Sequence, residues 1–299
     1  MAQPKIELRK IRDFGNNLSD TFEFIRQNFK PLLLSFFAIS GIFILLQAIS
    51  YGTFESNIFR SVHIQGNAMI GSQLFLGRNI LMYYFSWAFF LYIFFAWLGF
   101  ASMNVCVGAY MKYYNQHQGE QPDLEQVWNI FKRYYLKILI LSIPVGIITI
   151  IGYFLCLLPG IFLTIIFIPF PWILIMEDAS LGEGIQRCFE LTKSFFWISF
   201  GIYLVAYLIY SFASGIIGIM IGAIAGLITY LTTKDLGSTI TIVTSVLRVF
   251  TYLFYSIFLV SSMLHYFNLV EQRDATGMLQ KIDQIGNDRD EDRNIEEKY

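Results

Sequence analysis

The chain has 299 residues, of which 56% are hydrophobic, 18% are aromatic and only 14% are charged. Soluble globular domains carry about 25% charged residues, so this composition excludes a water-soluble globule, and its high apolar content excludes a disordered chain. The formal net charge of −1 gives no general attraction to nucleic acid, which we do not expect as a partner.

Runs of about 20 apolar residues, the length that crosses the hydrocarbon core as a helix, predict membrane spans. The first three such runs are Pro31–Gly52, Ile80–Ala109 and Leu136–Leu157. The second run is longer than a span requires, so we expect it to be tilted or to extend partly outside the lipid.

A proline and a glycine follow the third run. Proline fixes φ and glycine accepts positive φ, so Pro159 and Gly160 predict a tight turn. The fourth run, Ile161–Met176, is short and contains Pro169 and Pro171, each of which removes a backbone donor and kinks a helix. The carbonyls freed by a kink must be satisfied inside the protein, so we expect this span to pack among other helices.

The fifth run, Phe195–Leu231, has 37 residues, which is about 55 Å as one straight helix and more than the bilayer thickness. We therefore expect it to break near Ser211–Gly218, so that residues 216–231 either re-enter the membrane or lie at its outer face. The sixth run is Ile240–Phe267. The predicted fold class is an all-α membrane protein with six transmembrane helices arranged in hairpins.

The distribution of basic residues predicts which segments face the cytoplasm. Six, four, two and five Lys and Arg residues occur in segments 1–30, 110–137, 177–195 and the C-terminal tail. The loops on the opposite side carry only Arg60, Arg78 and Lys234, and Arg248 lies inside a span. Six crossings with both termini in the cytoplasm are the topology that this asymmetry favours.

These assignments divide the chain into three parts. Residues 1–30 form a cytoplasmic amphipathic N-terminal helix, residues 31–270 form the six-span domain, and residues 271–299 form a charged cytoplasmic tail that we expect to be disordered at its end.

Amphipathic segments precede the first, third and fifth runs. Their apolar residues follow one helical face over Ile11–Phe29, Leu124–Tyr135 and Leu181–Phe196. Each segment is either a separate interfacial helix in the headgroup region or a cytoplasmic extension of the next span. Ser180, followed three residues later by Glu183, predicts a capping box at the start of the third segment.

One stretch of the sequence carries a family resemblance. It contains Leu157-Leu158-Pro159-Gly160-Ile161, Pro169-Phe170-Pro171, Glu177-Asp178-Ala179-Ser180 and Leu191-Thr192-Lys193-Ser194-Phe195-Phe196-Trp197. This pattern resembles uncharacterised bacterial six-span integral membrane proteins related to the membrane domain of glycerophosphoryl diester phosphodiesterases. The chain departs from many of these proteins at Thr164-Ile165-Ile166, where they carry an arginine. The resemblance implies a location in the bacterial cytoplasmic (inner) membrane and implies no reaction, because the phosphodiesterase activity belongs to a separate soluble domain.

Arg248 is the first candidate ligand-binding residue, because an ionised side chain inside a span is costly and is usually functional. It either contacts the anionic group of a lipid or solute, or it extends outward to the headgroups or binds carbonyls exposed at the expected break in the fifth run.

Glu177 and Asp178 are the other candidate ligand-binding residues. They follow the kinked fourth span and precede the third amphipathic segment. We expect them to cap and solvate that helix start, and a role in proton or cation coupling is the alternative.

Small residues recur at every fourth position of the fifth run, at Ser214, Gly218, Gly222 and Gly226. Such a face lets two helices approach closely. Packing within the chain is the favoured interpretation, and dimerisation is the alternative.

The sequence contains no motif that combines the residues needed for catalysis, so we expect no catalytic residue, no cofactor and no metal site. The first functional hypothesis is a non-catalytic membrane subunit or scaffold of a bacterial envelope complex, with the lipid bilayer and other membrane proteins as partners. The second is a transporter or binder of a lipid or small amphiphile that uses Arg248 as its anion contact. The third is an enzyme that acts on lipids.

Overall fold

The computed structural model describes residues 5–66, 86–234 and 236–275, and all the regular structure in these ranges is helical. Six segments are long and apolar enough to cross a membrane: Phe14–Asn57, Trp87–Gln116, Leu124–Leu155, Leu157–Met176, Leu181–Thr232 and Ile242–Asp274. The prediction of an all-α membrane protein with six candidate spans is therefore confirmed. The predicted disordered end of the tail lies almost entirely in residues 276–299, outside the described residues.

The first two amphipathic segments continue directly into the spans that follow them. Helix α1 runs from Phe14 to Gly66 without a break at Pro31, and α4 runs from Leu124 to Leu155. Asp123 begins α4 in a capping box with Gln126. In these two cases the amphipathic segment is an extension of the span. Between them lies α3, Trp87–Gln116. The predicted second run began at residue 80, and its positions 80–85 lie outside the described residues.

The turn after α4 lies at a different residue from the predicted one. Helix α5, Leu157–Phe167, begins immediately after Cys156, whose extended backbone has φ −170° and ψ 152°. Pro159 is the third residue of α5, where a missing backbone donor costs nothing because the first helical N–H groups have no partner within the helix. The prediction of a turn at Pro159 and Gly160 was wrong for that reason.

Gly160 has a packing role instead. A Cβ atom at this position would lie 2.8 Å from the Cα atom of Tyr153, which is backbone of the facing helix. The absence of a side chain therefore lets α4 and α5 fold back on one another through a single connecting residue.

The fourth span is broken at its prolines, as predicted. Helix α5 ends at Phe167, and the short helix α6, Phe170–Met176, begins after Pro169 and has Pro171 in its first turn. The residues of α6 from Phe170 to Ile175 are all buried, so this span packs among protein neighbours as expected.

The third amphipathic segment differs from the first two. It forms a separate helix, α7, Leu181–Thr192, which a short 3-10 turn, η1, Lys193–Phe195, joins to α8, Phe196–Thr233. The predicted capping box is present, because the backbone N–H of Ser180 donates to Oε2 of Glu183 at 2.8 Å.

Helix α8 is continuous over 38 residues, so the predicted break near Ser211–Gly218 was wrong. Residues 216–231 continue the helix instead of re-entering the membrane or lying at its face. The reason is packing: Cβ atoms at Gly218, Gly222 and Gly226 would meet Leu247 or Val243 of α9, Leu236–Asp274. The small-residue face of α8 therefore packs within the chain, as the favoured interpretation predicted. Its partner is α9, a helix of similar length. Ser214 lies on the same stripe and is buried.

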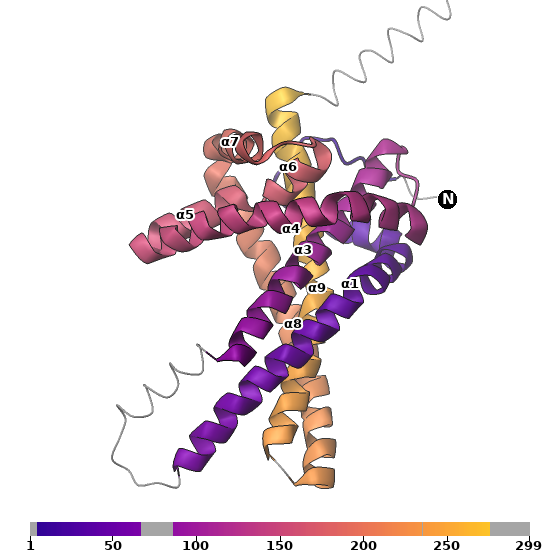
Figure 1. Cartoon of the computed structure of the whole chain (residues 1–299). Coiled ribbons are helices and arrows are strands. Elements are labelled where there is room, and N and C mark those ends of the chain that lie inside the picture. The colour runs from indigo at the N-terminus through magenta and orange to yellow at the C-terminus, as the bar shows by residue number, and fades with distance from the viewer. Residues whose placement is uncertain (1–4, 67–85, 235, 276–299) are drawn as a thin grey trace, which may run out of the picture.

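The helices define two ends of the molecule (Figure 1). The charged end contains α6, α7, the starts of α1 and α4, and the end of α9 near Asp274; it lies at the top of Figure 1. The far end is where α8 and α9 join at Lys234, and α8 and α9 lie side by side between the two ends. Helix α4 crosses the long helices near the charged end, and the α4–α5 hairpin projects to one side of the bundle (Figure 1).

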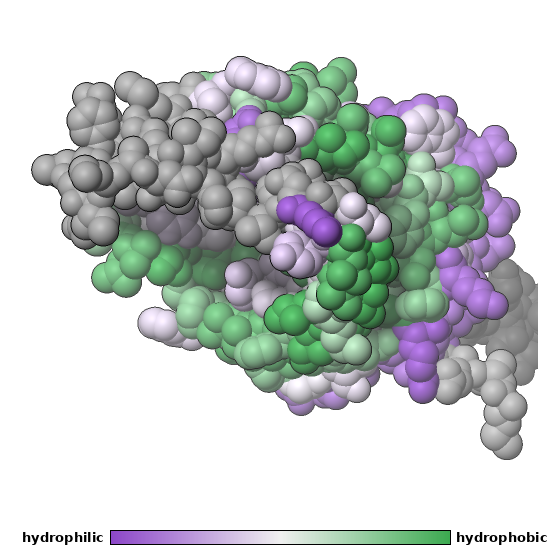
Figure 2. Space-filling model, turned by 90° about the horizontal axis from the view of Figure 1, so that it is seen from below, coloured by the Kyte–Doolittle hydropathy of each residue, from purple (hydrophilic) through white to green (hydrophobic). Residues whose placement is uncertain are grey.

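The surface is apolar over much of its area. Viewed from the far end, hydrophobic residues cover most of the coloured face, and hydrophilic residues gather along one side (Figure 2). The tip of the α4–α5 hairpin is among the most apolar regions, with Phe154 88% and Leu155 78% exposed.

Candidate functional site

Glu177 joins three helices at the charged end. It follows α6 directly, and its carboxylate accepts hydrogen bonds from Tyr266 Oη at 2.8 Å and from Arg187 Nε at 3.1 Å. Arg187 lies on α7 and Tyr266 on α9, and Arg187 also forms an ion pair with Asp274 near the end of α9. Glu177 therefore fixes the start of the α7 region against the end of α9.

Asp178 joins a different set of helices. Its Oδ1 atom accepts a hydrogen bond of 2.5 Å from Tyr134 Oη on α4, and its Oδ2 atom lies 3.5 Å from Lys112 Nζ on α3. Lys137 Nζ donates to the backbone carbonyl of Asp178 at 2.9 Å. The backbone has φ +54°, a left-handed conformation that Asp tolerates better than most residues.

Opposing effects act on the pKa of Asp178. Burial alone would raise the pKa of this carboxyl group, but the hydrogen bond from Tyr134 and the nearby charges of Lys112 and Arg133 together hold it below its ordinary value. The carboxylate is thus stabilised in its charged form.

These contacts correct the expectation for the acidic pair. Ser180 and Glu183 cap α7, whereas Glu177 and Asp178 turn away from its start and bind basic and tyrosine side chains of α3, α4, α7 and α9. Because each carboxylate already has a cationic partner, the arrangement is that of an ion-pair network that fixes helix ends.

The N-terminal segment is fixed at the same end by a buried arginine. The side chain of Arg12 is 0% exposed and forms an ion pair of 2.8 Å with Asp20 on α1. Its Nη1 atom donates to the carbonyl of Leu8 at 2.7 Å, and its backbone N–H donates to Asn268 Oδ1 on α9 at 2.8 Å. The segments predicted to be cytoplasmic are therefore gathered at one end of the bundle.

Arg248 lies on α9, far from this network. Its guanidinium group stacks 3.8 Å from the centre of the Tyr51 ring of α1, and Ser245 one turn earlier donates to the carbonyl of Ala48 at 3.3 Å. The residue is half-buried. Because α8 has no break, no carbonyls are freed there for Arg248 to bind, which removes that alternative.

Tyr51 connects Arg248 to an acidic residue that the sequence analysis missed. Tyr51 Oη donates to Glu55 Oε1 at 2.7 Å, and the other oxygen of Glu55 is buried with no hydrogen-bond partner in the described residues. The expected first span ended at Gly52, so Glu55 was counted as loop, but α1 continues beyond it. The i, i+4 spacing of Tyr51 and Glu55 was the available signal.

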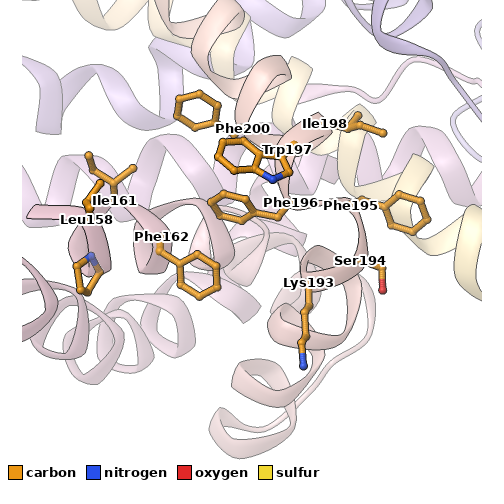
Figure 3. Close-up of a pocket in the computed structure, with 11 residues that line it drawn as sticks. Leu158, Ile161, Phe162, Lys193, Ser194, Phe195, Phe196, Trp197, Ile198 and Phe200 are labelled. Carbon is orange, nitrogen blue, oxygen red and sulfur yellow. The ribbon is translucent and has the colours of Figure 1, made fainter.

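A pocket between α5 and the start of α8 was also missed. It has a volume of about 1020 Å³. Figure 3 shows Phe162 of α5 beside Phe196 of α8, with Lys193 and Ser194 of η1 at one end. The ring centroids of Phe162 and Phe196 are 4.9 Å apart. The remaining lining residues are Leu158, Pro159, Ile161, Phe195, Trp197, Ile198 and Phe200.

A serine and a histidine meet between α8 and α9. Ser199 Oγ and His265 Nε2 are 2.8 Å apart, within the range of a nucleophile and its base. Both side chains are fully buried, so this contact is closed to a substrate and acts as an interhelical hydrogen bond. Sequence reasoning missed it because 66 positions separate the two residues.

Within the described ranges, no group of three or more His, Cys, Asp or Glu residues has the arrangement that could hold a metal ion. Comparison of the chain with protein-family models, with curated proteins and with solved structures gives no match.

Proposed function

We propose that this chain is an integral membrane protein that binds an anionic amphiphile of the bilayer, with Arg248 as its anion contact. The observation that carries this proposal is the environment of Arg248, a cation on a membrane-spanning helix. No carboxylate lies within 4.0 Å of its guanidinium in the described part of the chain, and its close contacts are tyrosines, the ring of Tyr51 and the side chain of Tyr252.

The physical argument rests on charge compensation. A tyrosine ring stabilises a guanidinium group by about 0.5–2 kcal/mol, but it leaves the net positive charge uncancelled. Holding an unpaired arginine in the apolar region is costly, so such residues usually serve a ligand or a transport path. A phosphate or carboxylate group would complete the site, because arginine binds such groups with two parallel hydrogen bonds.

Purified protein in neutral detergent, examined by native mass spectrometry with added phosphatidylglycerol or phosphatidylcholine, tests this function. We expect the wild type to retain phosphatidylglycerol preferentially, Arg248→Gln to retain one phosphatidylglycerol molecule fewer, and Arg248→Lys to keep part of that binding. Lys132→Gln, which removes a cation beside Trp128 on the exposed surface of α4, is the matched control. Equal binding of the two lipids, or an unchanged number of bound phosphatidylglycerol molecules in Arg248→Gln, contradicts the proposal.

A second candidate function is a non-catalytic subunit or scaffold of an envelope protein complex. The observation that favours it is the outward side of α8, where large apolar residues are exposed over five turns: Phe212, Ile216, Ile219, Met220, Ile224, Leu227 and Leu231. Lipid covers such a face as readily as a protein does, so a partner helix would bind it through close van der Waals packing. Site-directed photocrosslinking from Ile219 in cells yields a discrete protein adduct if this function holds, and adducts with lipid alone argue against it.

We also propose that the protein resides in the bacterial cytoplasmic membrane with its charged end in the cytoplasm. The positive-inside asymmetry of the sequence supports this orientation, since the basic segments share one end. Reporter fusions at the C-terminus and in the α8–α9 connection are expected to report cytoplasmic and extracytoplasmic locations. A reversed result overturns the orientation.

A further inference from the structure

The α5–α8 pocket lies at a different depth from Arg248. Ser199, one residue before the lining residue Phe200, pairs with His265 on α9, and Arg248 lies 17 residues before His265. At 1.5 Å per residue this places Arg248 about 25 Å from the pocket along the helices. Since the hydrocarbon core is about 30 Å thick, the two positions correspond to opposite leaflets.

The walls of the pocket are suited to hydrocarbon. Phe162 of α5 and Phe196 of α8 pack against one another in its wall, and Trp197 packs against both Phe196 and Phe200 with ring centroids 5.4 Å and 6.2 Å apart. The Trp197 side chain is 79% exposed, so the pocket opens at the lipid-facing surface of the molecule. Its volume of about 1020 Å³ is at the upper end of the range for small-molecule sites, about 300–1,000 Å³.

The polar end of the pocket carries one positive charge. Lys193 and Ser194 are both exposed there, and in the described residues no carboxylate lies within 4.0 Å of Lys193. The nearest acidic residue in the sequence, Glu190, pairs with Arg273 at 3.1 Å instead. A lysine and a tryptophan that line the same pocket are typical of a membrane–water interface, where an anionic headgroup is available.

We infer that this pocket is a binding site for an anionic phospholipid of the leaflet at the charged end. Its acyl chain lies against the apolar wall that the paired rings of Phe162 and Phe196 form together, and its phosphate contacts Lys193 and the hydroxyl of Ser194. The chemistry of the pocket selects this ligand class. The aromatic walls exclude a free polar anion, and the uncompensated charge of Lys193 attracts an anionic headgroup more strongly than a zwitterionic one. The inference stands independently of Arg248, which the bilayer core separates from this pocket.

The test uses full-length protein in nanodiscs that contain a photoreactive phosphatidylglycerol, with crosslinked peptides identified by mass spectrometry. We expect adducts on the peptides that contain Phe162 and Trp197. Lys193→Gln is expected to lower phosphatidylglycerol binding about fivefold, the factor that corresponds to about 1 kcal/mol for one lysine facing anionic lipid. Ile161→Trp fills the apolar part without changing the charge, and it is expected to reduce the crosslinks as well.

Two controls make the outcome specific. Lys132→Gln removes an exposed lysine beside Trp128 outside the pocket and should leave these crosslinks unchanged. Arg248→Gln should also leave them unchanged, so a failure of the function proposed for Arg248 is distinguishable from a failure here. Competition by free glycerol phosphate, or equal crosslinking by a photoreactive phosphatidylcholine, overturns the inference. So do wild-type crosslinks in both Lys193→Gln and Ile161→Trp.

Discussion

The two ends of the bundle are stabilised by different interactions. At the charged end, Glu177, Asp178 and Arg12 connect five helices and the N-terminal segment through ion pairs and hydrogen bonds. Towards the far end, glycines on α8 let α9 approach closely, and the guanidinium group of Arg248 stacks on the ring of Tyr51. Polar contacts therefore fix one end of the bundle, and close packing of helices fixes the other.

The largest expected loss follows from Arg12→Met. The substitution removes a fully buried charge that pairs with Asp20 and leaves that carboxylate and several carbonyls without a partner. Breaking a buried ion pair in this way costs about 3–5 kcal/mol. Denaturing-detergent titration in mixed micelles can follow unfolding through the reactivity of the buried thiols Cys106 and Cys188, in a Cys156→Ser background.

Arg26→Met is the control for this loss, because Arg26 is 62% exposed and pairs with Glu23 on the surface of α1. We expect its effect to stay within about 1 kcal/mol. If both variants lose equal stability, the buried network does not hold the charged end together.

Gly160→Leu tests close packing in the α4–α5 hairpin. Its new Cβ atom would meet the backbone of Tyr153, so the helices must separate, at a cost of about 1–3 kcal/mol. Gly146→Leu on α4 is the matched variant, because nothing lies within 4 Å of a Cβ atom there. We expect Gly146→Leu to be neutral or slightly stabilising in the same titration. A similar loss of stability in both variants would show that the loss comes from replacing glycine in the helix and not from the contact with Tyr153.

Gly218→Leu tests the far end. Its Cβ atom would lie 2.6 Å from a terminal carbon of Leu247, a side chain that can move, so we expect a smaller loss of about 1–2 kcal/mol. Gly215→Leu, which has open space around it, should be tolerated. Size-exclusion chromatography with light scattering separates this explanation from dimerisation: a change of oligomeric state in Gly218→Leu would show that the small-residue face joins two chains.

Asp178→Asn gives the smallest expected effect and adds a dependence on pH. The folded state lowers the pKa of this carboxyl group, so its contribution is fully present above the unfolded value near pH 4 and is lost as the pH falls through the lower folded value. Because Asp178 is about half exposed, the difference from the wild type at pH 7 should be less than about 1 kcal/mol. The stability difference between wild type and variant should shrink as the pH falls through the lowered pKa of the folded state, and a difference that stays constant with pH would show that it comes from packing.

Local patterns in the sequence predicted much of the fold. The number of candidate spans follows from the apolar runs, the capping box from the spacing of Ser180 and Glu183, and the break in the fourth span from Pro169. These features depend on neighbouring residues, and their physical causes act within one or two helical turns.

The failures have causes that the sequence does not display locally. The apolar run is continuous through Cys156, so no polar residue marked the turn. Glycines in α8 weaken an isolated helix, but packing against α9 outweighs that cost. The contacts of Arg248 and of Asp178 join residues that lie far apart in the chain, and only the tertiary arrangement brings them together.

The turn at Cys156 has a consequence for how the protein enters the bilayer during synthesis. No Asp, Glu, Lys or Arg occurs between Lys137 and Glu177. The connection between the two helices of this hairpin is therefore uncharged, and it consists of Cys156 flanked by leucines. Carrying an ionised side chain to the centre of the membrane costs about 2.5–3.5 kcal/mol on insertion scales. In the proposed orientation, helices α4 and α5 avoid this barrier and can insert together from one side, whereas the α8–α9 connection must translocate Lys234.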